Sequence, residues 1–237
     1  HNRDRGAARC NRRRVLTEVI QRHTGDKDIL AMASRAAERM GSDGDKAHVL
    51  ALAAEQTGSK DVAVRSALLR AIASMGSDGD RARVLRDAAK SYADNPQLRV
   101  DFFAALNKIG SDGERASVLR ELAVLPGLDV ETYREIAASA QRLGSDHDKV
   151  SVLEVLAARY SDEPLFAAAT TVGSDGERMR LLLAIMNGPV SEEALLRIIA
   201  AGITIGSDNE KADVLLAVAK KADGGSVREA GVRAAGK

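Results

Sequence analysis

A short acidic loop that recurs along the chain is its best candidate for chemistry. The run GSDGDKAHVL begins at Gly41, and close copies follow at Gly76, Gly110, Gly144, Gly173 and Gly206. Asp43 and Asp45 could bind calcium, because DGD resembles part of an EF-hand loop. An EF-hand, however, spreads its oxygen ligands over about twelve residues and ends with a bidentate glutamate. Here a lysine or arginine stands where ligands should continue, and the two carboxylates would repel a phosphate.

The remaining reactive residues form no recognisable catalytic or metal-binding pattern. The histidines have no zinc spacing, and Cys10 is the single cysteine, so it has no internal disulfide partner. The chain contains no GxSxG, Walker or GxGxxG pattern. We therefore predict that the protein is not an enzyme and needs no cofactor or metal. An enzyme whose residues converge only in space stays open as an alternative. The histidines are His1, His23, His48 and His147.

The recurrence of the loop indicates the elements that carry it. A Val-Leu pair inside each copy, such as Val49/Leu50 and Val84/Leu85, returns about every 34 residues. Apolar residues follow each pair at helical spacing, and turn signals divide each copy in two. This period is typical of a two-helix repeat. We predict an all-α, right-handed α-solenoid of about seven HEAT-like repeats over residues 11–237, a single domain. Residues 1–10 are predicted to be a flexible basic arm. The fifth repeat is short, with Leu165–Val172 left for its second helix.

Every letter of the loop also has a structural interpretation, which we favour over a binding site. Ser42 is predicted to cap a helix by accepting a hydrogen bond from the Asp45 amide, while the Asp45 carboxylate reaches back to the Ser42 amide. Asp43 suits the positive end of the helix dipole and pairs with Lys46 three residues later. Gly41 is predicted to end the preceding helix in the left-handed conformation. The same roles are expected in the five later copies.

Composition limits the classes of partner. The formal net charge is +1, aromatic residues are 3% of the chain and tryptophan is absent. Stacking platforms for nucleic-acid bases are therefore scarce, and we predict no nucleic-acid partner. No apolar run is long enough to span a bilayer, so no membrane span is expected in this chain. The Arg-rich start could contact phosphate or an acidic partner, but a solvated terminus is the simpler interpretation.

The motif S-D-x-[DE]-[KR]-x-x-V-L carries a resemblance to a known family. Its residues here are Ser42, Asp43, Asp45, Lys46, Val49 and Leu50, with their later equivalents. The motif resembles the bacterial helical repeat SDYEKRRVL, found beyond the catalytic part of BlaR/MecR-type membrane metallopeptidases and related HEAT-like proteins. The usual tyrosine is replaced by glycine in four copies and by histidine or asparagine in two. The peptidase zinc motif and membrane helices are absent, so the resemblance implies no catalytic residue.

These observations lead to a functional hypothesis with two alternatives. The leading prediction is a non-catalytic scaffold that binds a protein or peptide partner. The first alternative, implied by the resemblance, is a regulatory or sensor segment of a bacterial membrane metallopeptidase, placed outside the cytoplasm; otherwise a cytoplasmic location is expected. The second is the enzyme already mentioned. The candidate partner-binding residues lie on the predicted second helices of the repeats: Arg65, Arg70, Arg99, Arg134 and Arg197.

Overall fold

The protein is helical throughout the part of the chain that the computed structural model describes, which is residues 2–56, 61–93, 95–160, 163–188, 190–222 and 225–236. Side chains are described in these ranges except for residues 2–11, 90–93 and 96. His1, the Cys10 side chain and the Ser161–Asp162 part of the predicted break in the fifth repeat lie outside the described parts. No strand occurs in these ranges, which confirms the all-α prediction.

The chain divides into two compact units, residues 1–129 and 130–237, which are described separately. The first contains α1 (Asn2–Arg22), α2 (Lys27–Glu38), α3 (Asp43–Gln56), α4 (Val62–Ala73), α5 (Asp78–Ala93), the 3-10 turn η1 (Pro96–Leu98), α6 (Arg99–Leu106) and α7 (Asp112–Ala123). The second contains α8 (Val130–Gln141), α9 (Asp146–Ala157), α10 (Glu163–Thr170), α11 (Asp175–Met186), α12 (Glu192–Gly202), α13 (Asp208–Lys221) and α14 (Gly225–Ala235).

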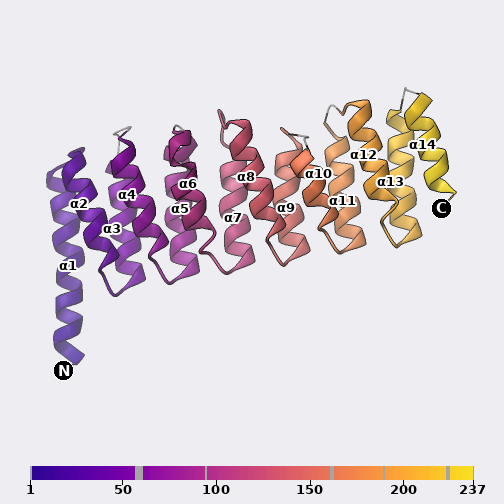
Figure 1. Ribbon diagram of the computed structural model, residues 1–237. Coiled ribbons are helices and arrows are strands. Elements are labelled where there is room, and N and C mark those ends of the chain that lie inside the picture. The colour runs from indigo at the N-terminus through magenta and orange to yellow at the C-terminus, as the bar shows by residue number, and fades with distance from the viewer. Residues whose placement is uncertain are drawn as a thin grey trace. The chain divides into compact units, whose positions relative to one another are not determined.

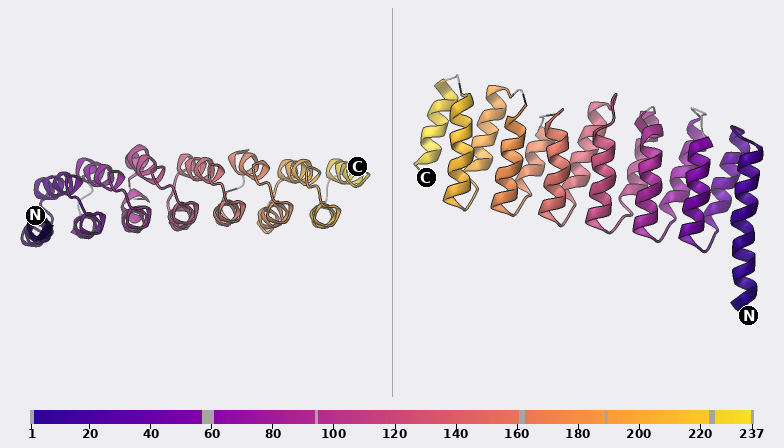
Figure 2. Two further views of the ribbon diagram at one scale, coloured as in Figure 1. Left: turned by 90° about the horizontal axis from the view of Figure 1, so that it is seen from below. Right: turned by 180° about the vertical axis from the view of Figure 1, so that it is seen from behind.

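Helices in each unit form two layers. In the first unit, α1, α3, α5 and α7 pack side by side, and α2, α4 and α6 form the other layer (Figure 1). In the second unit, α9, α11 and α13 form one layer, and α8, α10, α12 and α14 form the other (Figure 2). We call these the odd and even layers of each unit. Neighbouring odd helices within a unit therefore contact one another, and most of them also contact the even helices beside them.

The core lies between the two layers and explains the apolar spacing. The Val-Leu pairs Val49/Leu50 and Val152/Leu153 are completely buried, as are Ala47 and Ala82. Small alanine side chains let neighbouring helices approach closely without leaving voids. Burying these side chains removes apolar surface from water, at about 25 cal/mol per Å², and no single helix pair could bury both of its faces.

Two sequence predictions concern the ends of elements. Helix α1 begins at Asn2 and continues to Arg22, so it runs through residues 2–10, which were expected to be a flexible arm. Helix α10 has eight residues, which agrees with the predicted short second helix of the fifth repeat, although it begins two residues earlier. Helix α6 is equally short and follows the 3-10 turn η1. Even helices therefore differ in length within each unit.

Candidate functional site

The aspartate that follows serine in each loop binds the next loop along the chain. In the first unit, Asp43 Oδ2 on α3 accepts hydrogen bonds from the backbone N–H groups of Gly76 (2.9 Å) and Ser77 (2.8 Å). These amides precede α5, a turn about 33 residues further on. Asp78 makes the same two bonds to Gly110 and Ser111. In the second unit, Asp146 bonds Gly173 and Ser174, and Asp175 bonds Gly206 and Ser207.

The base three residues later completes this contact. Lys46 Nζ lies 3.5 Å from Asp43 Oδ1 and donates to the carbonyl of Ser74, the residue that follows α4. In equivalent contacts Arg81 donates to Lys108, Lys149 to Thr171 and Arg178 to Thr204. We call each aspartate and base together an Asp–base clamp: Asp43/Lys46, Asp78/Arg81, Asp146/Lys149 and Asp175/Arg178. Each clamp holds the turn that joins the following even helix to the next odd helix.

The predicted pairing of aspartate with base at i, i+3 is observed for four of the six copies. Those pairs are Asp43/Lys46, Asp78/Arg81, Asp146/Lys149 and Asp208/Lys211. Arg115 and Arg178 donate instead to the carbonyls of Ile109 and Val172, each six residues earlier. The bases are sheltered: Lys46, Arg81 and Lys149 are each less than one-tenth exposed. Desolvated cations of this kind require a nearby acceptor, and the clamp supplies one.

One of the two hydrogen bonds of the predicted capping box is observed in most copies of the loop. The serine hydroxyl accepts from the amide three residues later at Ser42, Ser77, Ser111, Ser145 and Ser174. Ser207 makes no such bond, so that prediction is wrong at the sixth copy. The reciprocal bond is also wrong where the serine amide is held by a clamp, because Ser77 and Ser174 donate to Asp43 and Asp146. Asp45 instead pairs with Arg13 of α1.

The glycine before each serine does not have the left-handed conformation that the sequence suggested. Among the described residues only Gly25 and Gly127 have positive φ, and neither lies in the repeated loop. The reason for glycine is the clamp itself. A Cβ atom on Gly76 would lie 3.1 Å from Asp43 Oδ2, and one on Gly173 would lie 3.2 Å from Asp146 Oδ2. At these clamped positions glycine is therefore favoured by the close approach of a carboxylate.

The electrostatic environment of Asp146 is that of a bound, ionised carboxylate. Desolvation alone would raise its pKa, but the amides of Ser174 and Gly173 and the charge of Lys149 outweigh that effect. The pKa of Asp146 is therefore held below its ordinary value. Its Oδ2 faces two N–H donors and its Oδ1 faces a cation. Within the described residues, no three His, Cys, Asp or Glu side chains gather as metal ligands would.

The five arginines predicted to bind a partner do not lie in equivalent environments. In the first unit, Arg65 on α4 is only 6% exposed, so a partner could not reach it without rearrangement, whereas Arg70 on α4 is exposed. Arg99 on α6 pairs with Asp129. In the second unit, Arg134 on α8 pairs with Glu131. A hydrogen bond with Tyr160 and the charge of Glu131 raise the pKa of Arg134 above its ordinary value.

Arg197, the fifth, lies in a groove of about 720 Å³ in the even layer of the second unit. Its guanidinium is 5.8 Å from the ring centroid of Phe166 and pairs with Glu193 and Glu163. A cation within about 6 Å of an aromatic ring face is attracted by the ring. The groove runs between α10 and α12, and Arg178, Thr170, Thr204, Ala167 and Ala200 also line it.

Three of the histidines have described side chains, and all three are exposed: His23, His48 and His147. His147 Nδ1 lies 3.2 Å from Glu177 Oε1, between α9 and α11.

Sequence reasoning singled out Arg197 but missed Phe166, Thr170 and Thr204. The short fifth repeat is the sequence feature that points towards two of them, because Phe166 and Thr170 lie on its short helix α10.

Comparisons with known proteins give no family for this chain. No protein-family model, no curated protein and no solved structure matches it. Across the described helices, none is both long and apolar enough to cross a bilayer.

Proposed function

We propose that this protein is a non-catalytic scaffold that binds a protein or peptide partner, built as a right-handed α-solenoid of about seven HEAT-like helix pairs. The observation that carries the proposal is the use of the recurring polar residues. Their carboxylates, hydroxyls and cations bond backbone groups of neighbouring turns, as Asp43 and Lys46 do for the turn before α5. These recurring residues stabilise the stacking of helices. The residues that differ between helix pairs are therefore the ones available for recognition of a partner.

The groove between α10 and α12 is the proposed place for the partner. It combines an apolar floor, Phe166 and Ala167, with oriented polar groups on Arg197, Thr170 and Thr204. Such a mixture suits an extended peptide, whose side chains can enter the groove while its backbone finds hydrogen-bond partners. The oriented charges Arg197, Glu163 and Glu193 would give specificity more than affinity.

A matched pair of variants tests this proposal. Ala200 on α12 lines the groove, and Ala104 on α6 occupies the same place in its helix, six residues before the following loop glycine. Both alanines are exposed, so glutamine is tolerated at either position. Tagged wild-type chain, Ala200→Gln and Ala104→Gln are each cross-linked in extract at modest salt, and the recovered proteins are identified. The affinity of a purified candidate is then measured by calorimetry.

The proposal expects one protein that is retained by wild type and Ala104→Gln and weakened at least tenfold by Ala200→Gln. Equal binding to all three would contradict the assignment of the groove. Turnover of a compound from a broad substrate panel, abolished by one point change, would contradict the scaffold function and favour an enzyme.

A regulatory segment of a membrane metallopeptidase is the second candidate. The observation that favours it is the S-D-x-[DE]-[KR]-x-x-V-L motif, which resembles the repeats of BlaR/MecR-type proteins. Sequencing of the surrounding gene tests it: an HExxH motif and membrane-spanning segments in the same reading frame would support this role, and their absence would exclude it.

A further inference from the structure

The last aspartate–base pair of the second unit has the composition of a clamp but a different environment. Asp208 Oδ1 and Lys211 Nζ lie 3.6 Å apart at the start of α13. The Asp208 side chain is 98% exposed, whereas the clamp carboxylate Asp146 is 27% exposed. Asp146 is covered by the Gly–Ser turn that it binds. Asp208 therefore presents to solvent the same charge arrangement that binds a turn elsewhere in the chain.

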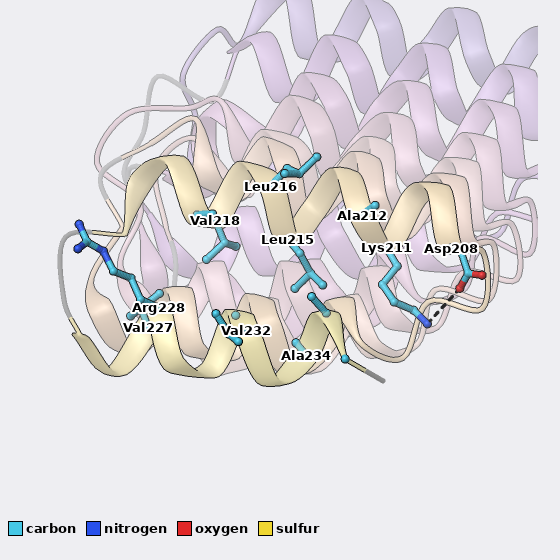
Figure 3. A pocket seen from close by; sticks show the side chains of 14 residues that line it. Asp208, Lys211, Ala212, Leu215, Leu216, Val218, Val227, Arg228, Val232 and Ala234 are labelled. Atoms are coloured by element: carbon cyan, nitrogen blue, oxygen red, sulfur yellow. Dashed lines mark ion pairs between the residues drawn. The ribbon is translucent and has the colours of Figure 1, made fainter.

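An apolar groove lies beside this pair. It has a volume of about 960 Å³, lies between α13 and α14, and is lined by Leu215, Leu216 and Val232 (Figure 3). Leu216 and Val232 are 57% and 75% exposed. Two large apolar side chains that line the groove are thus exposed to solvent.

Two positions that are exposed on α13 are buried at the equivalent places of odd helices against which the next odd helix packs. Ala212 is exposed, while its equivalents Ala47 on α3 and Val150 on α9 are completely buried. Ala219 is exposed, while its equivalent Ala89 on α5 is completely buried. In each of these cases the next odd helix packs against the helix that carries the buried residue: α5 on α3, α7 on α5 and α11 on α9.

We propose that the end face formed by α13 and α14 docks a partner helix pair whose first helix begins at a Gly–Ser turn. The two backbone amides of that turn would bind the Asp208 carboxylate, and a carbonyl just before the turn would accept from Lys211. The apolar side of the partner's first helix would cover Ala212, Leu215 and Ala219. The four clamps define this chemistry, because each shows the same two residue types holding such a turn.

A second copy of this chain does not offer the required turn. Its loop turns at Gly76, Gly110, Gly173 and Gly206 are already held by their own clamps, and Gly144 and Ser145 also have partners. The Gly41–Ser42 turn precedes α3, which already packs against α1, so the α13 of a second copy has no free place there. Helix α1 is continuous from Asn2 to Arg22 and has Ala7 and Ala8 where the other copies have glycine and serine. A side chain at the glycine position would lie about 3.1 Å from the carboxylate oxygen, as at Gly206. The occupant is therefore a separate helix pair of the same type. This inference does not depend on the α10–α12 groove.

The test presents such a helix pair to the full chain at high effective concentration. Residues 203–235, which contain the turn Gly206–Ser207 and helices α13 and α14, are appended a second time after Ala235. Amide hydrogen exchange is measured at the added glycine and serine, in this extended chain and in the same chain with Asp208→Ala at the original position. A third variant places alanine at the added glycine. Ala212→Ser, which keeps a small side chain, is the control for the face.

We expect the added turn to be protected from exchange, and Asp208→Ala and the added-glycine variant each to reduce that protection at least tenfold. An added turn that exchanges freely whether or not Asp208 is present would contradict the proposal. Concentration-dependent dimerisation of the unextended chain that Leu216→Glu abolishes would assign the face to a second copy, and would equally overturn it.

Discussion

The clamp predicts a specific coupling between Asp43 and Gly76. Replacing Asp43 by alanine removes two charge-assisted hydrogen bonds, at 2.9 and 2.8 Å, and leaves the sheltered Lys46 without its carboxylate. A hydrogen bond to a charged group contributes about 1.5–3 kcal/mol, but water can reach the exposed Gly76 and replaces part of the loss. We therefore expect Asp43→Ala to lower the free energy of unfolding by about 2–4 kcal/mol.

Gly76→Ala should cost about 1–2 kcal/mol in the wild-type chain, because its Cβ would lie 3.1 Å from Asp43 Oδ2 and the carboxylate must shift. In the Asp43→Ala background the crowding atom is gone, so the same substitution should cost nothing or stabilise slightly. The double-mutant cycle should give a coupling energy of about 1–2 kcal/mol. Urea denaturation of the four proteins measures it, and hydrogen exchange at Ser77 confirms that the effect is local, since stacked repeats can unfold in parts.

Gly44→Ala is the matched control for this cycle, since Gly44 adjoins Asp43 and a Cβ there would meet nothing within 4 Å. It should stabilise α3 by about 0.5–1 kcal/mol whether or not Asp43 is present. Additive costs of Asp43→Ala and Gly76→Ala would refute the reasoning, because glycine would then be required for a reason other than the carboxylate.

Three further outcomes follow from the structure. Because the pKa of Asp146 is lowered in the folded state, its contribution to stability is complete above about pH 4 and is lost as pH falls through the folded pKa; Asp146→Asn should weaken the acid dependence of urea denaturation. Gly113→Ala, in the first turn of α7 with no atom near its Cβ, should raise the free energy of unfolding by about 0.5–1 kcal/mol. Phe102→Ala should cost about 3–5 kcal/mol in the same assay, since Phe102 is completely buried against Phe103, whereas Val100→Ala, 79% exposed, should cost under about 0.5 kcal/mol.

Helices and caps were predictable from the sequence because their causes are local. The apolar spacing around Val49 and Val152 and the serines at Ser42 and Ser145 depend on residues within a few positions of one another. The short α10 was also visible, from the shortened distance between the fourth and fifth loops, at Gly144 and Gly173.

The role of the loop aspartate was not predictable in the same way. Asp43 has a local explanation as a first-turn acid paired with Lys46, and this pair is observed. Its second oxygen binds a turn 33 residues away, a contact that depends on how helices stack. The glycine prediction failed for the same reason, because a Cβ on Gly76 would crowd Asp43 Oδ2 at 3.1 Å, while the backbone of Gly76 does not have positive φ. The burial of Arg65 was not predictable either, because helical position alone did not show that α4 buries it.

The clamps bridge chain segments of unequal length with the same geometry. The aspartate and its glycine are 33 residues apart for Asp43 and only 27 apart for Asp146, yet both carboxylates lie 2.9 Å from the glycine amide. Whatever lies between the two contact points can gain or lose a helical turn without disturbing either. Natural or engineered insertions and deletions in the even helices should therefore be tolerated. Each one would change the surface of the even layer while the clamps remain intact.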